Sequence, residues 1–239
     1  MIFAAIARIT FRSLIGRRRT ILMVLLAAVP VLVGLLVRSN AGGIDAVGPT
    51  VDALVVRIVL PLLALVFGTA ALGSELEDGT AVHILTKPIS RTTIVLAKVA
   101  VAGSLTAALV VPSTILTTIL LAGPGAGDGG AVFALAVGTL IGSYVYAAIF
   151  AALGVLTSRG LILGLGYALI WEGALAGLLP GSQVFSVREY VRGIAHALSP
   201  GVLESVVGGS AFLYAAIALA AALAIASYRL ARFEVRGGD

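Results

Sequence analysis

The residues of this chain that could do chemistry gather in one polar stretch, ELEDGTAVHILTKPISRTTIVLAK, from Glu75 to Lys98. Three acids open it, a Gly-Thr pair and a Lys-Pro pair follow, and Arg91 comes after them. Ser74, three residues before Glu77, has capping-box spacing, so we expect a helix to begin after Ser74 with the acids in its first turn. Pro88 disfavours helical geometry in the residue before it and should end that helix. Ser90 or Thr92 can then cap the next helix.

Composition indicates what kind of protein contains this stretch. The 239 residues are 60% hydrophobic and only 11% charged, and the mean hydropathy is +1.13. Soluble domains have about 25% charged residues, so the chain is predicted to be an integral membrane protein. The net charge of +5 comes from short basic blocks beside apolar runs, which fits membrane topology rather than a nucleic-acid partner.

Several kinds of site are disfavoured by the sequence. Cysteine is absent, so there is no thiolate metal site. The two histidines, His83 and His196, are expected on opposite membrane faces and cannot share a metal ion. The glycine-rich segment 123–130 lacks the Gly-Lys-Ser/Thr ending of a phosphate loop. We therefore expect no cofactor in this chain and no catalytic residues.

Six apolar runs predict an all-α fold with six transmembrane helices in one domain, residues 1–239. Each run is about long enough to cross roughly 30 Å of hydrocarbon, and the runs cover about residues 21–37, 51–73, 93–121, 131–156, 161–179 and 211–228. Residues 1–19 are expected to form a basic amphipathic helix in the inner interface. Lys98, at the start of the third run, should project into the cytosol or snorkel.

The basic residues predict the orientation. Those on the N-terminal side are Arg8, Arg12, Arg17, Arg18, Arg19, Lys87, Arg91, Lys98, Arg159, Arg229, Arg232 and Arg236. The other side or the membrane holds only Arg38, Arg57, Arg188 and Arg192. The positive-inside rule therefore places both termini in the cytosol. We expect the chain in the plasma membrane.

Two further sets of charges lie away from the opening stretch. In the segment 180–200, Ser186 and Glu189 fit a capping box, and Arg188, Arg192 and His196 form a basic stripe at i, i+4 and i+8. This predicts an amphipathic helix at the outer interface. The stripe either meets anionic headgroups or cargo, or belongs to a helix anchored there for packing.

Arg57 and Glu172 are predicted to lie inside the spans at similar depth, roughly 10 Å below the outer surface. Asp52 is close to the outer end of the second run. An unpaired charge at that depth costs a few kcal/mol, so we expect Arg57 and Glu172 to pair. The pair could line a translocation path, act as a latch, or be a static tie between helices.

The opening stretch also carries a resemblance. The string Glu75-x-Glu77-x-Gly79-Thr80, then Leu85, Pro88-Ile89-Ser90-Arg91 and Lys98, resembles the signature after the second span in permease subunits of type-2 ABC transporters. His83 departs from that pattern. The six-span layout and the helix between spans five and six are similar to that family as well.

The resemblance implies a permease that dimerises with a second copy or a similar permease and pairs with a separate ATP-binding subunit, which would bind ATP and Mg²⁺. It implies export as the direction of transport. It also implies that residues 74–92 are a cytosolic coupling segment that docks on the ATPase. The residues assigned to this contact or its geometry are Glu75, Glu77, Asp78, Gly79, Thr80, Pro88 and Arg91.

Three other interpretations are open at this stage. The stretch could be a solvated loop whose charges only obey topology, although topology does not require three acids beside Lys87 and Arg91. The chain could be an ion-coupled secondary transporter that uses Arg57, Glu172 and Asp52, although it has no convincing inverted repeat. A membrane-embedded enzyme would need a further cluster of acids or histidines at one face.

Overall fold

The computed structural model describes residues 2–41, 43–77, 90–123, 129–157, 159–175 and 181–232. Within these ranges the chain is helical and forms no strand. The first half contains α1 (Ile2–Leu14), α2 (Arg17–Ala41), α3 (Ile44–Thr50), the π-helical stretch η1 (Val51–Val59), α4 (Leu60–Glu77) and α6 (Arg91–Ala122). The second half contains α7 (Gly129–Leu156), α8 (Gly160–Gly166), the π-helical stretch η2 (Tyr167–Leu175), η3 (Ser182–Phe185), α10 (Val187–Leu198), η4 (Gly208–Ser210) and α11 (Ala211–Ala231).

In the described part of the chain, five helical units are long and apolar enough to cross a membrane. They are Arg18–Arg38, Ile44–Gly73, Arg91–Ala122, Gly129–Leu156 and Gly208–Ala231. The fifth predicted run is instead the shorter apolar helix Gly160–Gly173, which at 1.5 Å per residue is about 20 Å long and shorter than the hydrocarbon core. Residues 176–180, which the prediction included in this run, lie outside the described residues.

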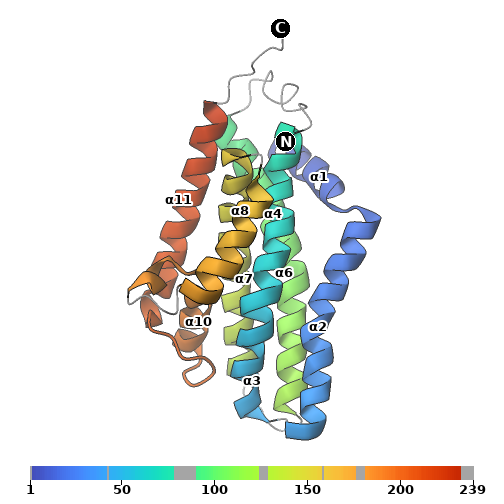
Figure 1. The fold of residues 1–239 in the computed structure, drawn as a ribbon, viewed down its shortest axis with the longest axis vertical. Helices are drawn as coiled ribbons and strands as arrows, with labels where there is room; N and C mark the ends of the chain where they lie inside the picture. Colours follow the sequence, from blue (N-terminus) through green and yellow to red (C-terminus); the bar gives the residue numbers. More distant parts are fainter. Residues whose placement is uncertain are drawn as a thin grey trace.

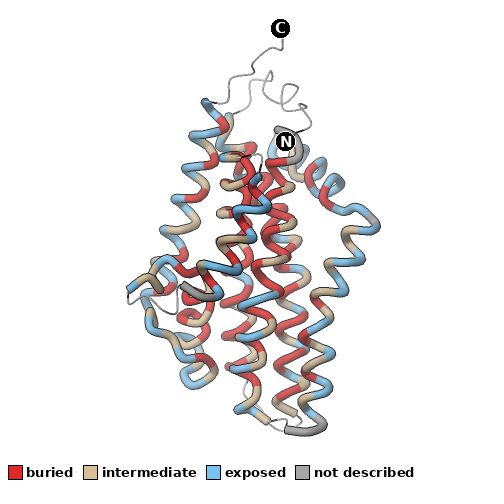
Figure 2. Tube along the Cα trace, in the orientation of Figure 1, coloured by how far each residue is buried: buried red, intermediate tan, exposed pale blue. Residues whose placement is uncertain are grey.

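The helix α7 occupies the centre of the bundle, packed against α4, α6, α10 and α11. The α1 helix and the last turn of α11 lie at the same end of the molecule, which we call the terminal end (Figure 1). The turn from α2 to α3 and the helix α10 lie toward the opposite end, the distal end (Figure 1). Burial is concentrated on α4, α6 and α7, whereas few side chains of α2 and α11 are buried (Figure 2).

The N-terminal helix differs in detail from its prediction. It ends at Leu14, and Arg17 already begins α2, so the basic block Arg17–Arg19 belongs to the first span. Thr10 and Leu14 are buried, and Phe3 and Ile9 are exposed. The helix therefore rests on the bundle through its last turns, against α6 and α4.

Two glycines of α7 let α10 approach closely. A methyl group added at Gly138 would lie 2.8 Å from the carbonyl oxygen of Val191 in α10, and one added at Gly142 would lie 2.5 Å from the Val191 side chain. This small-xxx-small spacing permits the close helix packing seen here. In contrast, a methyl group added at Gly166 would have nothing within 4 Å.

We predict that Gly138→Ala destabilises the protein while Gly166→Ala does not. Both changes gain helix propensity, but only the first forces α10 away from α7, at an expected cost of about 1–3 kcal/mol. The melting temperature of the two purified variants in mild detergent measures this difference. Equal melting temperatures would show that α10 is not seated on this part of α7.

Candidate functional site

An ion pair at the distal part of the bundle joins η1 to α10. The guanidinium of Arg188 donates to both oxygens of Asp52, from Nη2 to Oδ2 at 2.6 Å and from Nε to Oδ1 at 3.3 Å. Each of the two side chains is only 14% exposed. Bidentate pairs of this kind are among the strongest charged hydrogen bonds. Burial alone lowers the pKa of Arg188, but the hydrogen bond and charge of Asp52 outweigh it, so the pKa is raised and the arginine stays cationic.

The second arginine of the predicted basic stripe is also neutralised within the protein. Arg192 Nη1 donates to Oε1 of the buried Glu189 at 2.6 Å, and Arg192 Nε lies 3.7 Å from Asp52 Oδ1. His196 Nδ1 lies 2.9 Å from the carbonyl oxygen of Leu203 and so connects α10 to the loop after it. The stripe therefore faces η1 and this loop, which favours the packing interpretation over a surface for headgroups or cargo.

The predicted amphipathic helix is present as α10, and its apolar face is buried against the bundle; its place at the outer interface stays a prediction. Val187, Val191 and Ile194 are almost fully buried, and the helix packs on α7 and α11. Its predicted start is confirmed, since Ser186 Oγ accepts the N–H of Glu189 at 3.3 Å. Only this half of the capping box forms, because the Glu189 carboxylate turns toward Arg192.

The expected pair between Arg57 and Glu172 is wrong. Arg57 is exposed on η1, and no ion pair joins it to Glu172 among the residues that the structure describes. Glu172 is 3% exposed and is satisfied by neutral donors. It accepts from the backbone N–H of Val187 at 2.8 Å, from Ser186 Oγ at 2.5 Å and from Tyr167 Oη at 3.0 Å.

Glu172 thus acts as a cap supplied from another helix. Val187 is the first residue of α10, and its N–H is one of the four that a helix start leaves without an internal partner. A carboxylate there also interacts favourably with the helix dipole. Both predicted intramembrane charges, Arg57 and Glu172, lie in π-helical stretches, which are often found at functional sites.

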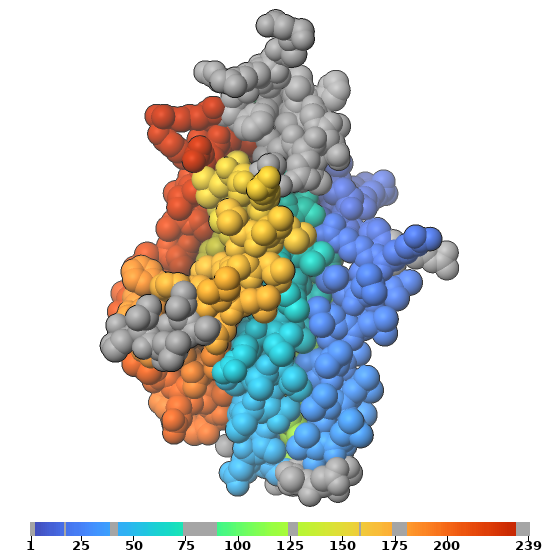
Figure 3. Space-filling model, viewed as in Figure 1, coloured from blue at the N-terminus to red at the C-terminus, as the bar shows by residue number. Residues whose placement is uncertain are grey.

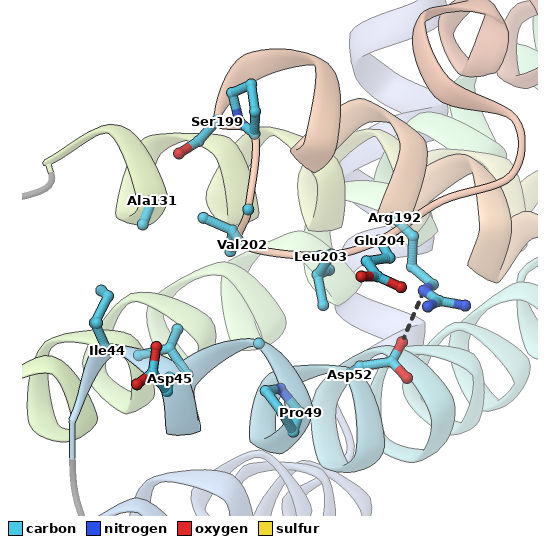
Figure 4. Close-up of a pocket in the computed structure, with 14 residues that line it drawn as sticks. Ile44, Asp45, Pro49, Asp52, Ala131, Arg192, Ser199, Val202, Leu203 and Glu204 are labelled. Carbon is cyan, nitrogen blue, oxygen red and sulfur yellow. Dashed lines mark ion pairs between the residues drawn. The ribbon is translucent and has the colours of Figure 1, made fainter.

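A cavity of about 560 Å³ opens beside the ion pair of Asp52 and Arg192 (Figure 4). It lies between α3 and the loop that follows α10, with Asp52 and Arg192 at one side and the carboxylates of Asp45 and Glu204 also lining it. Its volume is in the usual range for ligand sites, about 300–1,000 Å³. No group of three metal-ligating side chains occurs in the described part of the chain, here or elsewhere.

Three of the predicted coupling residues are described, and they lie at the terminal end. Glu75 and Glu77 lie in the last turn of α4, and Arg91 is the first residue of α6. Asp78, Gly79, Thr80 and Pro88 lie outside the described residues. The predicted cap of the third span is confirmed, because Ser90 Oγ accepts the N–H of Thr93 at 3.3 Å.

Two expectations at this end are wrong. Ser74 lies inside α4 and not at a helix start, so Glu75 and Glu77 are near a helix C-terminus, where the dipole disfavours acids by about 0.3–1 kcal/mol. A serine cap is worth only about 1 kcal/mol, less than continuing a helix packed on α6 and α7. Lys98 does not snorkel: it is 1% exposed and its Nζ donates to the carbonyl oxygen of Ala71 in α4 at 2.8 Å.

A comparison with known protein families matches residues 15–173 to the family described as "ABC-2 family transporter protein". This match covers more than half of the chain. The chain belongs to the ABC-2 transporter family. It is accordingly a multi-pass membrane permease, and the predicted resemblance is confirmed. The search of curated proteins finds no significant match.

The family match ends at residue 173, directly after Glu172. In this ABC-2 permease the hydrogen bonds and ion pairs around the start of α10 therefore join residues from both sides of that limit. Asp52 and Glu172 lie within the match, whereas Ser186, Arg188 and Glu189 lie beyond it. The Asp52–Arg188 pair was missed in the sequence because the two residues are 136 positions apart. The sequence did contain one indication of this pair, because Asp52 and Arg188 were both expected near the outer membrane face.

Asp52→Ala should destabilise the permease, because it leaves Arg188 charged and largely buried without its partner. Removing one member of a buried ion pair costs about 3–5 kcal/mol of stability. Because Asp52 and Arg188 are still partly exposed, we expect a loss near the lower end of this range. Thermal unfolding in detergent measures the loss.

A double-mutant cycle provides the control. Asp52→Ala combined with Arg188→Ala should cost clearly less than the sum of the two single changes, because the pair is removed together. Asp45→Ala, on the exposed rim of the same cavity, should be nearly neutral. Strict additivity of the two changes would mean that the ion pair does not contribute to stability.

Proposed function

We propose that this chain is the membrane subunit of an ATP-driven exporter, working as a dimer and driven by a separate ATP-binding subunit. The observation that carries the proposal is the family match together with the connection of the polar segment to two packed core helices. The segment 74–92 begins in the last turns of α4 and ends in the first turn of α6. In this proposal it is the coupling segment.

The packing of α4 and α6 supports a mechanical role for that segment. The buried Lys98 of α6 donates to the carbonyl oxygen of Ala71 in α4, and both helices pack against α7. A displacement of the segment by a bound partner would therefore move two core helices together. At its other end α4 continues without a break into η1, where Asp52 binds α10. The movement would reach the distal end of the bundle along this line.

The chemistry of ATP hydrolysis is assigned to the partner. The sequence has no Gly-x-x-x-x-Gly-Lys-Ser/Thr string, so we assign ATP and Mg²⁺ to the separate subunit. The acids Glu75 and Glu77 at the C-terminal turn of α4 favour a basic surface on that partner, because a nearby cation would offset their unfavourable interaction with the helix dipole. The permease itself would convert between two conformational states.

A second copy of the chain, or a similar permease, is expected to cover one apolar face. The helix α8 and the stretch η2 lie on the surface beside α4 (Figure 3). Their exposed large apolar side chains are Leu161, Ile162, Leu163, Leu165, Leu169 and Ile170. Because these exposed apolar side chains lie together on one face, we propose that this face lies in the dimer and that α2 and α11 face lipid.

The orientation follows from the exposed arginines. Arg8, Arg12, Arg159, Arg229 and Arg232 are exposed and lie on helix ends or turns at the terminal end. By the positive-inside rule we place this end in the cytosol and the chain in the plasma membrane.

The alternative of an ion-coupled secondary transporter has lost its main support. It relied on an exchangeable pair between Arg57 and Glu172, and Glu172 is instead bonded to Tyr167, Ser186 and Val187. No observation favours it over the ATP-driven reading.

Reversing the acidic charges of the coupling segment tests the proposal. The double variant Glu75→Lys/Glu77→Lys should insert into the membrane normally but lose the ATP-binding subunit, because two cations would face a surface that is expected to be basic. The measurement is ATP hydrolysis by the complex purified in mild detergent, with the partner identified as an ATPase domain of about 200–300 residues.

A matched variant at the distal end serves as the control. Asp45→Lys/Glu204→Lys changes the net charge equally on exposed side chains and should retain the ATPase and its hydrolysis. If the Glu75/Glu77 variant keeps a fully active ATPase, docking through this segment is excluded.

A further inference from the structure

A second cavity, of about 490 Å³, lies at the terminal end between the last turns of α7 and α11. Its described lining consists of Val155, Leu156, Tyr228, Arg229 and Arg232. None of these side chains is acidic. The cavity is thus apolar on the α7 side and carries two guanidinium groups on the α11 side.

The two arginines are arranged on one face of α11. Tyr228, Arg229 and Arg232 follow Ile225 at i+3, i+4 and i+7, which places the four side chains in one stripe along the helix. The guanidinium of Arg232 lies over the Tyr228 ring, 4.4 Å from its centroid. Stacking of this kind holds an arginine in place while its N–H groups remain available for hydrogen bonds.

The positive charge of the arginines at this cavity is larger than the negative partial charge of the two helix C-termini beside it. A helix C-terminus carries roughly half a negative charge, so the ends of α7 and α11 together contribute about one. Arg229 and Arg232 contribute two positive charges, and Arg159 lies in the exposed turn three residues after Leu156. Among the described lining residues there are thus two guanidinium groups and no carboxylate, and this arrangement favours an anion.

The surroundings indicate which anion. Along the same stripe, Ile225 is exposed on the side of the cavity toward the middle of the span, and Leu156, the last residue of α7, is an exposed apolar side chain of the lining. Tyr228, which is 55% exposed, has the position typical of an aromatic residue at a membrane surface. A ligand with a phosphate group at one end and an apolar chain at the other would place each part against matching side chains.

We propose that this cavity is a binding site for an anionic phospholipid, with Arg229 and Arg232 binding its phosphate and Ile225 and Leu156 contacting its acyl chain. Arginine matches phosphate geometry with two parallel hydrogen bonds. Anionic lipids are concentrated in the cytoplasmic leaflet, where the proposed orientation puts the terminal end. The binding itself does not depend on an ATPase or on a dimer, so it can succeed or fail independently of the proposed function.

The test uses the full-length protein in a neutral detergent, titrated with phosphatidylglycerol and with phosphatidylcholine while native mass spectrometry counts bound lipids. Phosphatidylglycerol should bind at least tenfold more tightly. Arg229→Ala/Arg232→Ala should weaken its binding about 30-fold, given the usual contribution of two arginines near anionic headgroups. Tyr228→Phe should bind normally, whereas Tyr228→Ala should weaken binding because the stacked position of Arg232 is lost.

The matched control is Arg8→Ala/Arg12→Ala, which removes the same charge from exposed positions of α1 at the same end. It should leave phosphatidylglycerol affinity within about twofold. Equal losses in both double variants would show only nonspecific attraction and overturn the proposal. Full competition by inorganic phosphate at the same concentration as the lipid would overturn it too, since the site would then recognise free phosphate. If Arg229→Ala/Arg232→Ala fails to fold, Tyr228→Phe and Tyr228→Ala decide the result.

Discussion

The start of α10 is buried in the bundle, and buried backbone N–H groups need hydrogen-bond partners. Glu172 and Ser186 supply these partners: the carboxylate accepts the N–H of Val187, and the serine hydroxyl accepts that of Glu189. With this cap in place the apolar face of α10 can pack on α7 at Gly138 and Gly142. The short helix α8 and stretch η2 are in turn positioned by the need to bring Glu172 to α10.

The same helix connects the two halves of the permease. Asp52 in η1 binds Arg188 in α10, and η1 is continuous with α4, the helix that leads to the polar segment at the terminal end. A π-helical stretch has a looser hydrogen-bond ladder than an α-helix and can absorb a change of twist. Here the stretch η1 lies between α4, which a bound partner would displace in the proposed mechanism, and the Asp52–Arg188 ion pair, which holds the other end of η1 against α10.

The helices and caps could be predicted because their signals are local. Apolar runs mark the spans, Ser90 and Ser186 have the side chains that cap a helix, and the glycines of α7 have close-packing spacing. The partners of buried charges could not, because depth in a span does not determine which way a side chain points. Glu172 was expected to need a cation, yet three neutral donors satisfy it. Lys98 was expected to reach solvent, yet its ammonium group donates a hydrogen bond to a backbone carbonyl oxygen of α4.

The continuity of α4 through Ser74 changes the meaning of the acidic residues after it. As the first turn of a separate helix they would have been stabilised within the chain, and no partner would be required. As the last turn of a span they oppose the helix dipole. The distal end shows the opposite arrangement, with Asp52 and Glu189 bound to Arg188 and Arg192. Charges that are neutralised internally respond little to their surroundings. The terminal end has exposed arginines and has acids at a helix C-terminus. A bound partner would therefore change the electrostatic energy of this end more than that of the distal end.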